Sequence, residues 1–174
     1  MITIQESGMC FGPFAQESVF NIENSNVFLK LKGIKTVEFV LFLDQNKRSG
    51  EKLLPEIWLI EAKTSAPKPD NNVDFSAYIT EIVQKFENSL CLFLAIALQR
   101  YSNAELSAKF KNINLKELQV KLLFVVKNHK DEWLMPLKDT LQQRLIPLVT
   151  SLNLGSNNVV VLNENLARIK GLIA

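Results

Sequence analysis

Short apolar segments alternate with polar ones through the first half of the chain, a pattern typical of β-strands. Residues 2–5 alternate between Ile and a polar residue, which predicts a short first strand. Segments 27–32, 36–43 and 56–63 are rich in Val, Leu, Ile and Phe, so we expect three further strands there. The polar stretch 44–51 contains a Ser-Gly pair and predicts a turn that joins the last two strands.

The strongest helical pattern follows Pro69. Apolar residues recur at spacings of three and four from Phe75 to Ala97, which gives one apolar face to a long helix. Asp74 precedes this pattern and is a candidate N-cap. Glu81 and Lys85 have the spacing of an ion pair, which we expect on a different face of the helix.

The remaining pattern completes an alternation of helices and strands. We expect a short helix over 14–20, an interior strand over 118–127, a helix over 133–152 perturbed at Pro147, a strand over 159–162 and a helix over 164–170 capped by Asn163. This order predicts a single α/β domain over residues 1–174. The predicted architecture is an α/β/α sandwich with a mixed central sheet and helices on both faces.

Composition supports an ordinary globular domain. Apolar residues make up 47% and charged residues 22% of the 174 residues, which excludes a disordered or collagen-like chain. The longest apolar run, 90–98, is half of what a membrane span needs, and the first residues lack the pattern of a signal peptide. Cys10 and Cys91 are far apart and favour free thiols. We therefore expect a cytoplasmic protein without a membrane partner. Segment 90–98 is apolar all round, which predicts burial on several sides, in part against another subunit.

Charge is uneven along the chain. Residues 100–130 carry seven Lys or Arg and two Glu, a local charge of +5, whereas residues 1–29 carry three Glu and no basic residue. A basic stretch of this kind can follow a phosphate backbone. The competing interpretation is a solvated surface beside an acidic one.

Candidate chemistry rests on carboxylates and lysines. The sequence has no phosphate-binding loop, no G-x-S-x-G motif and a single histidine, His129, which argues against triads and His-based metal sites. Glu61 and Lys63 end an apolar strand and point to the same face, and Glu38 on the preceding strand converges with them if the register permits. Two carboxylates and a lysine suit Mg²⁺ and the activation of water for attack on a phosphate. A solvent-facing pair on an edge strand is the alternative for Glu61 and Lys63.

The order of these residues and elements resembles the PD-(D/E)XK nuclease superfamily. The resemblance rests on Glu38 in the segment VEFVLFL, the strand EIWLIEAK that ends in Glu61-x-Lys63, and the helix and strand that follow. It covers residues 14 to about 127 and implies a restriction endonuclease-like fold. Val37 stands where the motif has proline, and Glu38 is Glu rather than Asp. These departures leave the number of metal ions open.

The resemblance implies a role for each matching residue. Glu38 and Glu61 would be ligands of Mg²⁺, with Mn²⁺ as a substitute, and Lys63 the lysine that activates water. Superfamily members also carry an acid on an early helix and a Gln or acid on the helix after the E-x-K motif. The matching residues are Glu17, with Glu23 as second choice, and Gln84 or Glu81.

The leading hypothesis is therefore a Mg²⁺-dependent endonuclease that hydrolyses double-stranded DNA. By resemblance its setting would be restriction or anti-phage defence, and a homo-oligomer or a partner subunit would supply targeting. One alternative is a non-catalytic nuclease-like subunit that binds a partner protein or nucleic acid. Another is DNA binding through residues 100–130 without cleavage, which would depend steeply on salt.

Overall fold

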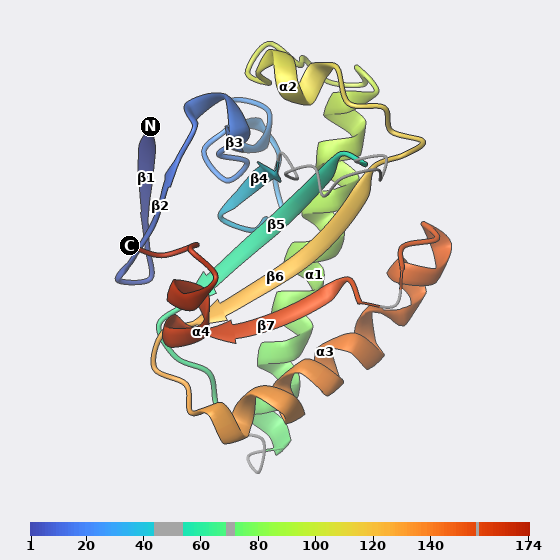
Figure 1. Cartoon of the computed structure of the whole chain (residues 1–174). Coiled ribbons are helices and arrows are strands. Elements are labelled where there is room, and N and C mark those ends of the chain that lie inside the picture. The colour runs from blue at the N-terminus through green and yellow to red at the C-terminus, as the bar shows by residue number, and fades with distance from the viewer. Residues whose placement is uncertain (44–53, 69–71, 156) are drawn as a thin grey trace.

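A five-stranded mixed sheet lies at the centre of the molecule (Figure 1). The computed structural model describes residues 1–43, 54–68, 72–155 and 157–174. The turn predicted for 44–51 lies outside these residues. The chain is thus a mixed α/β protein, as the alternation of patterns predicts.

The sheet joins an antiparallel half to a parallel half. Its strands in spatial order are β3 (Val19–Phe20), β4 (Phe39–Leu43), β5 (Glu56–Lys63), β6 (Gln119–Val126) and β7 (Val159–Asn163). Strands β3, β4 and β5 pair antiparallel, whereas β5, β6 and β7 pair parallel. Strand β5 begins and ends where the sequence predicts. Strand β6 is almost entirely apolar because it lies between β5 and β7 and because both faces of the sheet are covered there.

Two long helices cover one face of the sheet, α1 (Asn72–Ala97) and α3 (Asp131–Ser151) (Figure 1). The apolar stripe of α1 is buried against the sheet, as its spacing predicts. Asp74 lies inside the first turn of α1, so its prediction as N-cap is wrong. Helix α3 runs through Pro147, since its buried leucines hold it against the sheet. The short helix α2 (Ala108–Lys111) packs at one end of this layer through Phe110.

The opposite face is covered mainly by a hairpin of β1 (Ile2–Glu6) and β2 (Met9–Phe14). Met9 and Phe11 are buried against Phe39 and Ile60 of the sheet. The short helix α4 (Glu164–Ile169) completes this layer. The prediction of helices on both faces is therefore only partly correct. This face is covered mainly by the hairpin, whose strand β2 the sequence does not predict.

Helix α4 begins where the sequence predicts. The side-chain oxygen of Asn163 accepts a hydrogen bond from the backbone N–H of Leu166 at 3.0 Å, which is the predicted N-cap.

Two predicted elements are wrong because local hydrogen bonds or sheet pairing prevail. Segment 27–32 contains the 3-10 helix η2 (Phe28–Lys30) rather than a strand, since the Ser25 hydroxyl accepts the N–H of Phe28 and closes a turn. Segment 14–20 forms the 3-10 helix η1 (Gln16–Ser18) and then strand β3, which pairs with β4.

Segment 90–98, which ends one residue beyond α1, is buried over part of its circumference. Leu90, Leu92, Phe93 and Ile96 are buried, whereas Cys91 and Leu98 are exposed, so burial on several sides is observed only in part within this chain. Among the described residues, no helix combines the length and the apolar character that crossing a bilayer requires.

Candidate metal centre

Charged side chains cluster at the end of β5, on the face of the sheet that packs against α1. Because side chains alternate along a strand, Glu61 and Lys63 share the face of Ile57 and Leu59, which is the face that α1 covers. Glu61 is completely buried. Glu38 directly precedes β4 and lies beside Glu61. The backbone N–H of Glu38 donates to the carbonyl of Ile60 at 3.1 Å.

Lys85 of α1 bridges the two strands from the helical side. Its ammonium nitrogen lies 2.9 Å and 3.0 Å from the two carboxylate oxygens of Glu61, and 3.6 Å from Oε1 of Glu38. Lys85 therefore faces inward to the sheet, and its predicted place on another face of the helix is wrong. Its predicted partner Glu81 pairs with Lys35 instead, at 3.1 Å.

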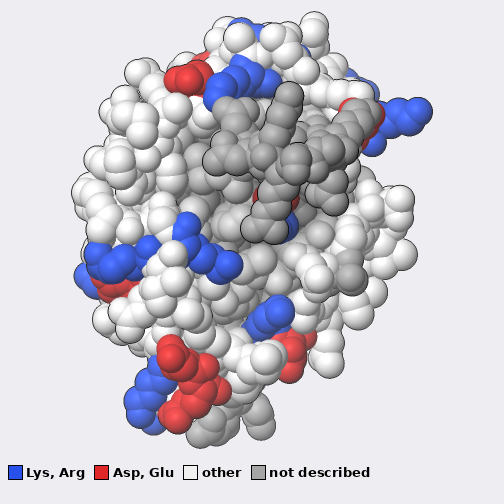
Figure 2. All heavy atoms as spheres, in the orientation of Figure 1, with Lys and Arg blue, Asp and Glu red and all other residues white. Residues whose placement is uncertain are grey.

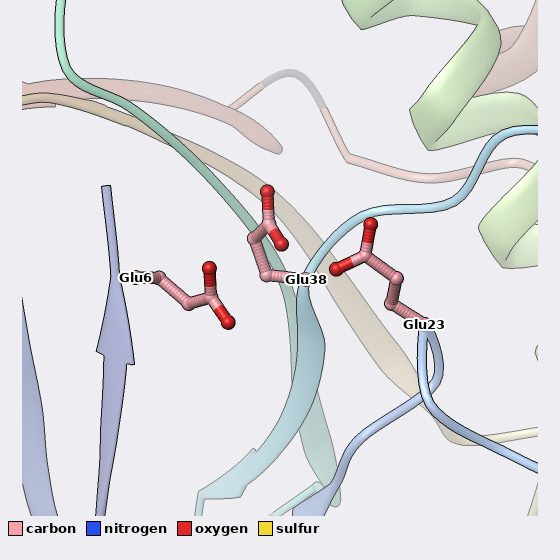
Figure 3. Close-up of side chains that lie close together, drawn as sticks. All are labelled: Glu6, Glu23 and Glu38. Carbon is pink, nitrogen blue, oxygen red and sulfur yellow. The ribbon is translucent and has the colours of Figure 1, made fainter.

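Three glutamates from distant segments meet beside Lys85. Glu6 ends strand β1, Glu23 lies in the segment after β3, and Glu38 precedes β4; their side chains point toward one another (Figure 3). One carboxylate oxygen of each lies within 4.8 Å of the others. The hairpin that carries Glu6 is tied to the end of β5, because the Ser7 hydroxyl donates to the Ala62 carbonyl at 2.9 Å.

Lys63 forms the outer edge of the cluster. Its ammonium group lies 3.2 Å from Oε1 of Glu61 and 4.0 Å from Glu81, and its side chain is 29% exposed. Tyr78 of α1 donates to the Ser65 carbonyl at 3.0 Å and so holds the segment after β5 against the helix. Lys63 thus connects a buried carboxylate to the solvent-facing surface.

Burial and mutual repulsion raise the pKa of the carboxyl groups. Burial is the largest cause for Glu61, where Lys85 and Lys63 oppose it, and for Glu38, where the charge of Glu61 adds to it. Burial, a hydrogen bond with Glu38 and the charge of Glu38 together raise the pKa of Glu23 to about 7. Burial alone would lower the pKa of Lys85, but Glu61 and Glu38 raise it overall. Groups with shifts of this kind concentrate at functional sites.

The donor set fits a hard divalent cation. Carboxylate oxygens are the ligands that Mg²⁺ takes in proteins, usually one or two of them together with water. Among the described side chains, Oε1 of Glu61 is buried without a hydrogen bond, although both ammonium groups lie within ion-pair distance of it. The oxygens that no described ammonium group holds at this range belong to Glu6 and Glu23, which stand with Glu38 in the group of three carboxylates.

The predicted residues are partly brought together. Glu38, Glu61 and Lys63 converge, and the second choice Glu23 joins them. Glu17 does not belong to the acidic cluster: it is 57% exposed and lies 3.9 Å from Lys109 of α2, at the other end of the sheet (Figure 1). The reason is that η1 packs against α2 rather than over β5. Of the two helix candidates, Gln84 is exposed, whereas Glu81 reaches Lys63.

Two residues of the cluster, Glu6 and Lys85, have no functional role in the sequence-based hypothesis. Glu6 continues the alternation of Ile2 and Ile4, so its side chain lies on the inward face of the first strand. Lys85 lies between Ile82 and Phe86, at the margin of the apolar stripe of α1. The pattern around each residue predicts that it is at least partly buried, but the sequence does not predict which side chains contact it.

The basic stretch 100–130 does not form one continuous track. Lys109 lies near Glu17, Lys121 lies 3.7 Å from Glu56, and the Lys127 ammonium donates to the Gly8 carbonyl at 2.7 Å. On the face drawn in Figure 2, basic and acidic side chains are interspersed. This distribution supports the solvated-surface interpretation.

No protein-family model matches the chain, and no match is found among curated proteins or solved structures.

Proposed function

We propose that this protein is a Mg²⁺-dependent nuclease with a restriction endonuclease-like fold that hydrolyses DNA phosphodiester bonds. The observation that carries the proposal is the convergence of Glu38, Glu61 and Lys63 at the end of β5, together with two further glutamates. The mixed sheet carries Glu61 on β5, and Glu38 directly precedes the antiparallel neighbour β4, an arrangement that supports the proposed fold.

Glu38 and Glu61 would hold the metal, with Glu23 and Glu6 as neighbouring acids. A Mg²⁺ ion held there would supply Lewis acidity and would lower the pKa of an attacking water. Glu61 fixes the position of the Lys63 ammonium at 3.2 Å. The exposed fraction of Lys63 allows the same group to orient a water molecule or to offset the charge of a phosphate. Hydrolysis adds that water to phosphorus, and one P–O bond breaks as the leaving oxygen takes up a proton.

Basic side chains around this edge support a phosphodiester substrate. The backbone N–H of Lys127 donates to the carbonyl of Lys63 at 2.9 Å, and the Lys127 ammonium group lies on the hairpin side of the same edge, where it donates to the Gly8 carbonyl. Lys68 and Lys130 lie 5.5 Å and 5.0 Å from the ring centre of Trp133 in the adjoining segment. Cations at this edge would attract a polyanion to the cluster.

A cleavage assay with a matched pair of variants tests the proposal. Supercoiled plasmid, linear duplex DNA, single-stranded DNA and RNA are incubated with the protein in Mg²⁺, Mn²⁺ or EDTA. Glu61→Gln is compared with Glu56→Gln, which removes another buried carboxylate from the opposite end of the same strand. We expect metal-dependent cleavage that Glu61→Gln abolishes and Glu56→Gln retains. Equal cleavage by the parent and both variants would refute the proposed site.

A second candidate function follows from Lys85. Its ammonium group already neutralises Glu61 and approaches Glu38 without any metal. This contact favours a nuclease-like module that keeps the fold and serves as a non-catalytic subunit. Such a module would bind a partner protein or nucleic acid, and it would show neither cleavage nor metal binding in the same assay.

A further inference from the structure

Lys85 fills the space between the two carboxylates that the proposed metal would share. Its ammonium nitrogen contacts both oxygens of Glu61 and lies 3.6 Å from Glu38. An ammonium group and a divalent cation seek the same oxygens, and two cations at such close range repel each other strongly in a buried site. Lys85 and a metal bound by both carboxylates therefore exclude one another.

The two lysines of the cluster differ in their freedom to move. The side chain of Lys63 is 29% exposed and already lies near Glu81 at the surface, so it can leave Glu61 without losing every acidic neighbour. The side chain of Lys85 is 8% exposed, and it emerges from α1 between two completely buried residues, Ile82 and Phe86. Lys85 is thus the cation whose withdrawal from the carboxylates requires the larger rearrangement.

The cluster retains acidic groups that Lys85 does not pair with. Two ammonium groups, of Lys63 and Lys85, face four carboxyl groups: Glu6, Glu23, Glu38 and Glu61. Glu6 and Glu23 lie beside Glu38 and offer oxygen ligands to an arriving cation while Lys85 still contacts Glu61. A cation can therefore approach the cluster before Lys85 withdraws.

We propose that Lys85 is an internal counter-ion that competes with the metal. In the metal-free protein its ammonium group holds the carboxylates of Glu61 and Glu38 together across β4, β5 and α1. It must withdraw before a divalent cation binds both carboxylates, and Lys85 therefore sets the metal affinity. This inference rests on the proposed function, because it takes the cluster to be a metal site.

Replacing Lys85 by a neutral side chain of similar length tests the competition. Lys85→Met is compared with the parent and with Lys121→Met, a matched control whose lysine pairs with buried Glu56 at the opposite end of β5. Mn²⁺ serves as the probe, and its affinity is measured by titration calorimetry and by the rise of the unfolding temperature on adding Mn²⁺. We expect Lys85→Met to bind Mn²⁺ about tenfold more tightly than the parent, a typical coupling between two mutually exclusive contacts. Lys121→Met should bind Mn²⁺ like the parent.

The possible outcomes separate this inference from the proposed function. Equal or weaker Mn²⁺ binding by Lys85→Met, with saturable binding by the parent, overturns the competition but leaves the metal site intact. If the parent and Lys85→Met both fold and neither binds Mn²⁺, the proposed function itself fails. Should Lys85→Met unfold without metal, refolding in Mn²⁺ decides the matter: recovery of the folded state supports the competition, and no recovery overturns it.

Discussion

The two ends of strand β5 each bury a glutamate beside a lysine, but they do so in different surroundings. At the first end Glu56 accepts a hydrogen bond from the Trp58 indole and lies 3.7 Å from Lys121, whose ammonium group is 5.5 Å from the Trp58 ring centre. At the other end Glu61 meets two lysines and lies in a cluster with three more glutamates.

The two glutamates differ in how many segments of the chain supply their partners. The described partners of Glu56 are Trp58 of β5 itself and Lys121 of the neighbouring strand β6. The cluster around Glu61 combines β1, the segment after β3, the start of β4, and α1. Four acids brought together in this way repel one another when ionised, which Lys63 and Lys85 offset in part. Such an arrangement is typical of sites retained for function.

The largest expected difference between the two ends is in cleavage. Lys63→Met removes the exposed ammonium group at the Glu61 end and should lower the cleavage rate about 1,000-fold, within the usual range for a residue that orients or activates water. Lys121→Met removes the lysine at the Glu56 end and should leave the rate unchanged. Both variants are compared by their initial cleavage rates on duplex DNA in Mg²⁺. Equal rates would mean that the two ends of β5 do not differ in function.

The next largest difference is in stability. Lys85→Met leaves Glu61 with one less counter-ion in a fully buried position and should lower the free energy of unfolding by about 3 kcal/mol. Lys121→Met breaks a partly exposed pair and should cost about 1 kcal/mol or less. Urea unfolding of the metal-free proteins compares the two, and similar losses would mean that the two ends are equivalent structural pairs.

A smaller effect concerns pH. The pKa of Glu23 is about 7 in the folded protein against 4.5 for an ordinary Glu, so the folded state binds the extra proton between these values. Its contribution to stability is therefore present at low pH and declines as pH rises from about 4.5 to about 7. Glu23→Gln should flatten this decline in metal-free protein. Urea unfolding on both sides of about pH 6 measures it, and an unchanged slope would contradict the crowding of acids at this end.

The smallest effect is expected at Glu17. This residue is exposed beside Lys109 of α2, at the end of the sheet opposite the acidic cluster. Glu17→Gln should keep the cleavage rate and change the free energy of unfolding by less than about 0.5 kcal/mol, as is usual for surface substitutions. A large loss of cleavage would restore Glu17 as a ligand and would refute the assignment of Glu23 in its place.

Much of the sheet and one half of the candidate site follow from local pattern. Strand β5 is predicted with its bounds, because the apolar run from Ile57 to Ile60 stands between polar segments. The same alternation places Glu61 and Lys63 on one face. Convergence with Glu38 also follows, since two consecutive strands tend to pair.

The rest depends on contacts between distant segments. The hairpin that carries Glu6 crosses to the end of β5 through Ser7, and no local pattern encodes that docking. Lys85 has the spacing of a surface ion pair with Glu81, but the buried carboxylate of Glu61 draws it inward. Glu17 fits the superfamily's order of residues, yet the packing of η1 against α2 decides its place.

Titration calorimetry with Mn²⁺ measures whether the carboxylates at the end of β5 bind a divalent cation. The parent, Glu38→Gln and Glu56→Gln are compared after treatment with EDTA and removal of the chelator. We expect saturable binding by the parent and by Glu56→Gln, and none by Glu38→Gln. Binding that is absent in the parent, or that persists unchanged in Glu38→Gln, would refute the proposed metal centre.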